Sequence, residues 1–234
     1  MYNLSCVFSV ICSVILPIGM AVLFCVRNKN SWKPILFGAL TFVVFQVFIR
    51  IPILEYAMSE TEWFIIMSST QPFLYALFLG STAGLVEEGG RFLVMSQLMK
   101  KQRSTLDAIA FGVGHGGIEA ILFVGIKAVG LLLSPIEQAA PSEVFAAGAE
   151  RLSAIAMQIT FSVMVMKSVR ERKYIWLLLP FIIHTCVNLG AALAISGVNI
   201  WIIEVSFLLA AALMVWFVVK EYRKEKPDPR QTEA

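Results

Sequence analysis

The sequence predicts an all-α fold, a polytopic membrane helix bundle of about seven transmembrane helices. Of its 234 residues, 58% are hydrophobic and 15% are charged, whereas soluble domains average about 45–50% apolar and about 25% charged residues. Several apolar runs reach the ~20 residues that cross a bilayer. The net charge of +3 comes from basic clusters between those runs, which is the pattern of a membrane protein and does not indicate a nucleic-acid partner.

Seven predicted spans cover residues 4–26, 34–54, 71–99, 106–131, 149–168, 174–196 and 200–219 and form one transmembrane domain, 1–219. The first is expected to be retained, because residues 1–26 lack a basic n-region and their apolar stretch is too long for a signal peptide. The tail 220–234 is charged and contains prolines, so we expect it to be disordered in the cytoplasm.

Charges between the spans predict the orientation. Basic residues follow alternate spans, at Arg27, Lys29, Lys100, Lys101, Arg103, Lys167, Arg170, Arg172, Lys173, Lys220, Arg223 and Lys224. The opposite connections carry Glu55, Glu60, Glu62, Glu137 and Glu143. By the positive-inside rule, the N-terminus lies outside and the C-terminus in the cytoplasm of a multi-pass cell-membrane protein whose first partner is the lipid bilayer.

Two connections and the cysteines need separate comment. The segments TEWFIIMSST (61–70) and LLLSPIEQAAPSEVFA (131–146) are half apolar, and each is expected as a short interfacial helix or as a plain loop. The sequence has no internal repeat. Four cysteines all fall within predicted spans without metal-type spacing, so we expect them to pack as small apolar side chains.

Ionisable residues gather where lipid is expected. The segment GLVEEGGRF (84–92) in the third span carries Glu87, Glu88 and Arg91, and both histidines of the chain, His115 and His184, lie in the fourth and sixth spans. Because a charged group in a bilayer is costly, such residues face the protein interior or a water-filled cavity and mark functional sites.

The depth of these residues can be counted from the cytoplasmic basic clusters. Glu87 lies 13 residues before Lys100, His115 lies 12 after Arg103 and His184 lies 11 after Lys173. At 1.5 Å per helical residue, each lies roughly 16–20 Å from its basic marker. Gln158 in the fifth span, nine residues before Lys167, is only slightly shallower. We therefore predict that residues from four spans meet at one level.

Spacing within each span supports this prediction. Three pairs are separated by four residues and so share a helix face: Glu87–Arg91, His115–Glu119 and His184–Asn188. Glycines surround these groups and permit close helix approach. Pro180, one turn before His184, removes a backbone hydrogen bond and is expected to bend the sixth span towards the site.

Several of these residues have simpler structural interpretations. Glu88 and Arg91 can form an ion pair that only stabilises the third span. Glu119 can orient His115, and Gln158 can be an ordinary interhelical hydrogen-bonding group. Glu150 is explained by its place at a helix start and is kept as a weak supporting candidate.

Two further features are not assigned to the site. Arg50, about 17 residues past Lys33, is expected to anchor its span at the outer interface. The segment GVGHGG (112–117) fits the glycine pattern of a dinucleotide site, but a membrane span cannot supply the βαβ unit that such a site needs. No nucleotide partner is therefore predicted.

The constellation suits hydrolysis. A carboxylate beside imidazoles in a hydrated cavity can activate water as a general base, and a second imidazole with an amide can stabilise an oxyanion. Alternatively, His115, His184 and Glu88 would supply three ligands to a catalytic Zn²⁺, with a fourth position left for water.

The segments EEGGR, GHGGIEA and HTCVN resemble the YhfC family of intramembrane metalloproteases, which is similar to the CAAX-prenyl-protease-like, bacteriocin-processing and PrsW-type membrane peptidases. The resemblance covers nearly the whole chain, because these motifs follow in order on the third, fourth and sixth spans. It implies that Glu87 or Glu88 is the base, that His115 assists it, and that His184 and Asn188 hold the oxyanion. Two residues separate the glutamates from Arg91, as in the PrsW pattern, whereas the prenyl-protease pattern has three.

The sequence thus predicts an intramembrane endopeptidase, a hydrolase that cleaves a membrane-anchored peptide or protein. The alternatives are a proton-coupled transporter, in which buried Glu and His form a relay, and an inactive peptidase-like scaffold. Many carriers show inverted repeats with interrupted helices, and the lack of an internal repeat favours the peptidase.

Overall fold

The described part of the chain is helical throughout. The computed structural model describes residues 2–133, 140–195 and 199–225, and over these residues it contains helices and their connections but no strand. The predicted all-α class is therefore confirmed. The part of the expected disordered tail beyond residue 225 and the centre of the 131–146 connection lie outside the described residues.

Seven long helical segments follow the seven apolar runs, and several are built from consecutive α and π-helical pieces. In order they are α1 (Tyr2–Val10), η1 (Ile11–Ile15) and α2 (Leu16–Arg27); η2 (Lys29–Ser31), α3 (Trp32–Phe42), η3 (Val43–Arg50) and η4 (Ile53–Met58); α4 (Glu62–Thr70) and α5 (Pro72–Gln97); α6 (Thr105–Ala120), η5 (Ile121–Gly125) and α7 (Ile126–Leu133); α8 (Pro141–Glu171); α9 (Ile175–Ile195); and α10 (Ile200–Glu225).

Length and apolar composition identify fewer candidate membrane spans among the described residues than the seven that the sequence predicts. Within the described residues, five helices are long and apolar enough to cross a bilayer: Tyr2–Arg27, Lys29–Met58, Thr105–Leu133, Pro141–Glu171 and Ile200–Glu225. The pair α4 and α5, bent by 119° at their junction, makes a sixth if it is one broken span. In α9 the apolar stretch is shorter, Ile175–Gly190. The chain thus has five or six candidate spans, and the expected count of seven is not confirmed.

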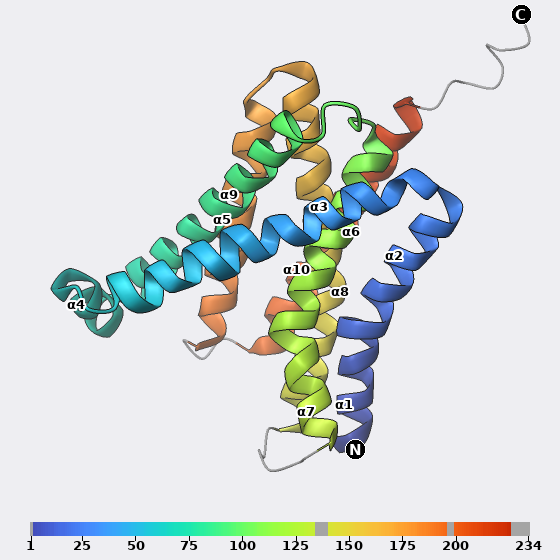
Figure 1. Cartoon of the computed structure of the whole chain (residues 1–234). Helices are drawn as coiled ribbons and strands as arrows, with labels where there is room; N and C mark the ends of the chain where they lie inside the picture. The colour runs from blue at the N-terminus through green and yellow to red at the C-terminus, as the bar shows by residue number, and fades with distance from the viewer. Residues whose placement is uncertain (1, 134–139, 196–198, 226–234) are drawn as a thin grey trace, which may run out of the picture.

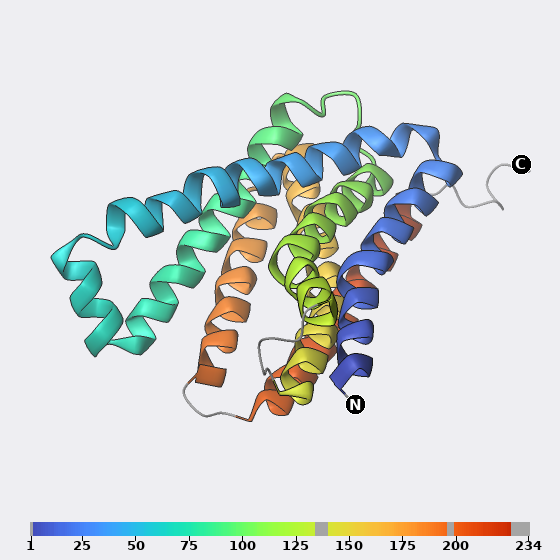
Figure 2. The same ribbon diagram turned by 60° about the horizontal axis from the view of Figure 1, so that its bottom comes forward.

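The helices form a bundle with a projecting arm. In Figures 1 and 2, α6, α8, α10 and the α1–α2 segment lie side by side, α3 crosses α6 obliquely, and α4 lies at the far tip of the arm. The main packing partners are α3 with α6, α6 with α8, α5 with α9, and α8 with α10. Of the two connections expected as a short helix or a loop, the first contains the helix α4.

Glycines let α6 lie directly against its neighbours. A Cβ atom at Gly114 would lie 1.9 Å from the carbonyl oxygen of Ile35 on α3, and one at Gly112 would lie 2.4 Å from the Cα of Ile159 on α8. No other residue fits at such distances, because real Cβ contacts are longer than 3.0 Å. Small residues are the usual means by which membrane helices approach closely, and here they bring the His115 segment between α3 and α8.

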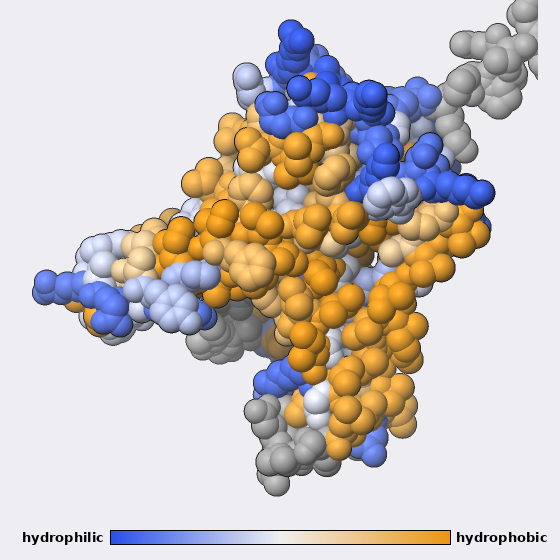
Figure 3. All heavy atoms as spheres, in the orientation of Figure 1, coloured by the Kyte–Doolittle hydropathy of each residue, from blue (hydrophilic) through white to orange (hydrophobic). Residues whose placement is uncertain are grey.

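The basic connections gather at one end of the molecule. The side chain of Gln102 donates to the Asn30 carbonyl at 3.1 Å, and Arg170 donates to the Arg103 carbonyl at 3.4 Å. The end of α10 joins them, because the backbone N–H of Thr105 donates to Glu225 at 2.6 Å. Figure 3 shows hydrophilic side chains at this end and at the tip of the arm, with apolar surface between them. An apolar surface between hydrophilic ends is what a protein embedded in a bilayer presents to the lipid.

Candidate active site

Helix α5 supplies a buried charged triplet. Glu87, Glu88 and Arg91 are 3%, 1% and 0% exposed. Nη1 of Arg91 donates to Oε1 of Glu88 at 2.7 Å, and Nη2 of Arg91 lies 3.7 Å from Oε2 of Glu87. The spacings of three and four residues place both carboxylates beside the same guanidinium. Because buried charges need such partners, the triplet can exist within the bundle.

Helix α6 brings His115 to Glu87. The imidazole is fully buried, and its Nε2 lies 3.1 Å from Oε2 of Glu87, a hydrogen bond in which the ring N–H donates to the carboxylate. The Phe42 ring meets the imidazole edge to face at 5.3 Å, and Phe111 stacks on it at 6.2 Å. These rings fix the orientation of the imidazole, while its Nδ1 atom has no hydrogen-bond partner in the described structure.

Helix α9 brings His184 to both glutamates. Its Nδ1 lies 2.9 Å from Oε1 of Glu88, and its Nε2 lies 3.9 Å from Oε2 of Glu87. The ring stacks on Phe161 of α8, with centroids 5.3 Å apart and planes 16° apart. Pro180 lies inside α9, as expected, one turn before the histidine. His184 therefore connects the two carboxylates.

Helix α8 completes the cluster through Gln158. Its Oε1 accepts a hydrogen bond from Nη2 of Arg91, and its Nε2 donates to Glu119 at 2.5 Å and to Oε2 of Glu87 at 3.4 Å. The predicted meeting of residues from four helices at one level is present in this geometry: α5, α6, α8 and α9 each contribute. Gln158 is the hydrogen-bonding bridge among them.

Glu119 has a different partner from the His115 that the spacing suggests, and it shares that partner with Glu150. Glu119 lies four residues after His115, but its carboxylate accepts from Arg151 at 3.2 Å and from Gln158. Glu150 accepts from Arg151 at 2.5 Å. The i, i+4 relation gives proximity along a helix, yet a charged side chain on α8 provides stronger hydrogen bonds than a buried imidazole. Glu119 and Glu150 thus form an ion-pair network at the edge of the cluster.

A cavity of about 300 Å³ adjoins the cluster. Its polar lining consists of Gln46, Arg50, Glu87, Glu119, Arg151, His184 and Asn188. Asn188 lies one turn after His184 on the same face and makes no hydrogen bond within the described residues. Glu88, in contrast, lines a separate apolar groove of about 540 Å³ between α5 and α9. The two adjacent glutamates therefore face different spaces.

Sequence reasoning did not assign two arginines of this cavity to the site. Arg50 was expected to anchor at the interface, but its guanidinium turns into the cavity and donates to the Leu79 carbonyl at 2.6 Å and to Oγ1 of Thr82 at 3.2 Å. Arg151 is 7% exposed. Both lie within predicted spans, where the cost of burying a charge is itself a functional signal.

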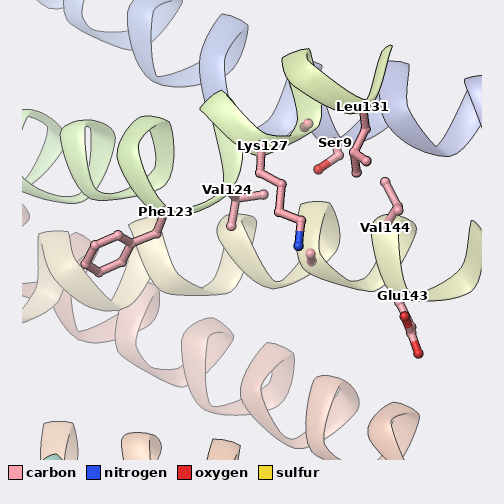
Figure 4. Close-up of a pocket in the computed structure, with 9 residues that line it drawn as sticks. Ser9, Phe123, Val124, Lys127, Leu131, Glu143 and Val144 are labelled. Atoms are coloured by element: carbon pink, nitrogen blue, oxygen red, sulfur yellow. The ribbon is translucent and has the colours of Figure 1, made fainter. Parts of the chain in front are cut away.

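Another cavity, of about 230 Å³, holds no such constellation. Figure 4 shows it between α7 and α8, lined by Val124, Leu131 and Val144, with Lys127 and Glu143 as its charged groups. None of the candidate site residues lines it. The candidate site residues therefore gather at the Glu87 cavity and not at this one.

The geometry of His115, His184 and Glu88 bears on whether the cluster could hold a metal ion. The described residues contain no group of three or more His, Cys, Asp or Glu side chains that could hold one. His115 and His184 each direct a ring nitrogen at a carboxylate, at 3.1 and 2.9 Å, and Nδ1 of His115 lacks the second-shell acceptor that a metal-bound imidazole normally has. In this arrangement, the side chains of His115, His184 and Glu88 therefore do not form a zinc site.

The chain is similar to a described family of membrane proteins and to one curated relative. The model of the family described as YhfC intramembrane metalloprotease matches residues 12–134 and 130–207. A protein of Bacillus subtilis (strain 168) described as "Uncharacterized membrane protein YhfC" is 33% identical over 238 residues, which cover 89% of this chain and 92% of the relative. No solved structure matches the chain. The matched residues include all four helices of the cluster.

Proposed function

This chain belongs to the YhfC family, and we propose that it is an intramembrane endopeptidase that hydrolyses a peptide bond of a membrane-anchored protein or peptide. The family description itself names an intramembrane metalloprotease. One observation carries the proposal: Glu87, His184 and Asn188, from two helices, line one cavity with His115 hydrogen-bonded behind Glu87. A general base and oxyanion donors thereby face the same space.

Glu87 is the better general base of the two glutamates. Its Oε2 is held by His115, while its Oε1 makes no hydrogen bond within the described residues and Glu87 lines the cavity. A water molecule in the cavity can therefore reach Oε1. Glu88 is engaged by Arg91 and His184 and lines the apolar groove instead, so we assign it a positioning role.

The surrounding groups hold Glu87 in place. His115 and Gln158 donate to its Oε2 at 3.1 and 3.4 Å, and the Arg91 guanidinium lies 3.7 Å away. These donors fix the orientation of the Glu87 carboxylate. Glu119 and Glu150 do not contact Glu87 directly; their hydrogen bonds hold Arg151 in position at the cavity.

The proposed reaction needs only water and the peptide. Glu87 accepts a proton from water as the hydroxyl oxygen attacks the carbonyl carbon. The resulting oxyanion accepts hydrogen bonds from the Asn188 amide and from Nε2–H of His184, whose Nδ1 lies 2.9 Å from Oε1 of Glu88. As the C–N bond breaks, Glu87 returns the proton to the leaving nitrogen, and an acid and an amine are released.

We further propose that seven segments, including α5 and the short α9, cross the bilayer, with the N-terminus outside and the C-terminal tail 220–234 in the cytoplasm. The gathering of Lys100, Arg103 and Arg170 with the end of α10 at one end of the molecule supports this orientation. The tail and the domain boundary at residue 219 remain predictions from the sequence.

The test is cleavage of membrane-tethered peptides by the purified protein in lipid nanodiscs. A randomised peptide library is incubated with the protein, and new termini are identified by mass spectrometry. Glu87→Gln should lower the rate by about 10²–10⁴-fold, and Asn188→Ala by about 10²–10³-fold. Glu143→Gln, at the other cavity, is the matched control and should leave the rate unchanged.

The two glutamates should differ in their defects. Glu87→Gln should fold normally and lose the chemical step, whereas Glu88→Gln should also loosen Arg91 and His184 and lower the unfolding temperature. Cleavage that survives Glu87→Gln and Asn188→Ala contradicts the proposal. Proton-coupled solute uptake by a protein that cleaves no peptide would identify a carrier instead.

A further inference from the structure

The cavity beside Glu87 contains a cation that has no carboxylate partner. Arg50 hydrogen-bonds only to neutral groups, the hydroxyl of Thr82 at 3.2 Å and the carbonyl of Leu79 at 2.6 Å. Within the part of the chain that the structure describes, no carboxylate oxygen lies within 4.0 Å of its guanidinium, although many ion pairs occur elsewhere. A cation within the membrane normally has such a partner.

The other cations of this region are neutralised. Arg91 pairs with Glu88 at 2.7 Å, and Arg151 pairs with Glu119 at 3.2 Å and with Glu150 at 2.5 Å. Glu87 has its own hydrogen-bond partners and attracts Arg50 electrostatically, but the two groups form no ion pair within 4.0 Å. Among the arginines around the cavity, Arg50 is thus the exception within the described residues, and its guanidinium can contact the carboxylate of a ligand directly.

A second unmet polar group lies beside it. Gln46, four residues before Arg50 on η3, is 5% exposed, and its Oε1 is buried without a hydrogen-bond partner. The same cavity is lined by Gln46, Arg50, Glu87 and His184. Buried polar groups left unpaired are costly, and a carbonyl oxygen in this position is suited to accept the backbone N–H of a bound peptide.

Resting on the proposed peptidase function, we propose that Arg50 binds a carboxylate of the substrate close to the scissile bond, while Gln46 accepts a backbone N–H. A guanidinium presents a planar pair of N–H donors that matches a carboxylate in a bidentate contact. Thr82 and the Leu79 carbonyl hold the fork in position through Nε and Nη2. The carboxylate is either a free C-terminus or an Asp or Glu side chain next to the cleaved bond.

The test measures binding, separately from cleavage. Three probes share one dodecanoyl-linked apolar tetrapeptide: one with a free C-terminal carboxylate, one amidated, and one amidated with an internal Asp. Affinities are measured in phosphatidylcholine nanodiscs with the full chain carrying Glu87→Gln, so that no probe is consumed. The same measurements are made with Arg50→Gln, with Arg50→Lys, and with Arg27→Gln as the control at an exposed arginine outside the cavity.

We expect at least one carboxylate probe to bind about tenfold more tightly than the neutral amide, as for a charged hydrogen bond. The probe that shows the preference identifies the source, a C-terminus or an acidic side chain. Arg50→Gln should abolish the preference, Arg50→Lys should retain part of it, and Arg27→Gln should leave it intact.

Equal affinity of all three probes, or no binding of any, overturns the proposal, as does a preference that survives in a folded Arg50→Gln protein. If Arg50→Gln fails to fold, Arg50→Lys decides, because an ammonium group lacks the planar pair of donors and must weaken the preference. Peptide cleavage that ignores the carboxylate would reject the role of Arg50 and leave the peptidase function standing. A carboxylate preference in a protein that cleaves no peptide would support carboxylate binding by Arg50 and reject the peptidase function.

Discussion

Replacing Gly114 by alanine adds a single methyl group at the closest approach of α6 to α3. The new Cβ would lie 1.9 Å from the Ile35 carbonyl oxygen, whereas ordinary contact begins at 3.4 Å. The helices must therefore separate locally by about 1.5 Å, the difference between these values. Overpacking of this kind costs about 1–3 kcal/mol of unfolding free energy.

The displacement should also reach the site, because Gly114 precedes His115. The His115–Glu87 hydrogen bond is 3.1 Å long, and a shift of about 1 Å or more takes it beyond hydrogen-bonding distance. Misplacement on this scale costs about 10²-fold in rate. We expect Gly114→Ala to lower both the unfolding temperature and the cleavage rate, measured in nanodiscs by tryptophan fluorescence and by release of new peptide termini.

The matched control is Gly19→Ala in α2, where a Cβ meets no atom within 4 Å. It should be neutral or stabilising by up to about 1 kcal/mol, the gain in helix propensity. A Gly114→Ala protein with the unfolding temperature and cleavage rate of the Gly19→Ala protein would refute the close packing of α3 on α6 described above.

Three other predictions follow from the same contacts. Gln158→Ala removes a partner of Arg91 and should cost about 1–3 kcal/mol in thermal unfolding; an unchanged unfolding temperature would contradict the bridging role. Lys167 is 7% exposed and lies 2.8 Å from Glu221, which Lys224 also contacts at 2.6 Å. Lys167→Met should therefore destabilise the protein by about 1–3 kcal/mol in thermal unfolding, and an unchanged unfolding temperature would contradict the contribution of this ion pair. Finally, the purified active protein should contain less than stoichiometric zinc by elemental analysis and should keep its cleavage rate after chelation; loss on chelation with recovery on zinc addition would reject the metal-free mechanism.

Axial position was the part of the site that the sequence could predict well. In a membrane protein the bilayer fixes where each helix begins, so counting residues from a basic cluster gives a depth. Glu87, His115, Gln158 and His184 were placed at one level in this way, and the structure brings them into one hydrogen-bonded cluster. The counting works because α5, α6, α8 and α9 are continuous around these residues.

Lateral position and tilt were not predictable to the same degree. The partner of Glu119 is Arg151 and not His115, because neighbouring helices supply contacts that no intrahelical spacing encodes. Arg50 was expected at an interface, but the oblique course of α3 and η3 across the bundle carries it into the cavity (Figure 1). The bend between α4 and α5 falls where Gln71 leaves the helical conformation before Pro72, but its size of 119° is not given by the sequence pattern.

Adjacency of the two glutamates has a geometric consequence for the chemistry. Consecutive residues on an α-helix point about 100° apart, so Glu87 and Glu88 share Arg91 and His184 as partners but border different cavities. Glu87 faces the polar cavity with Asn188, while Glu88 borders the apolar groove between α5 and α9. His184 spans them, with Nδ1 at Glu88 and Nε2 towards Glu87. In the proposed mechanism, Glu88 holds the histidine that faces the cavity while Glu87 is the base, so each glutamate of the pair has a separate role.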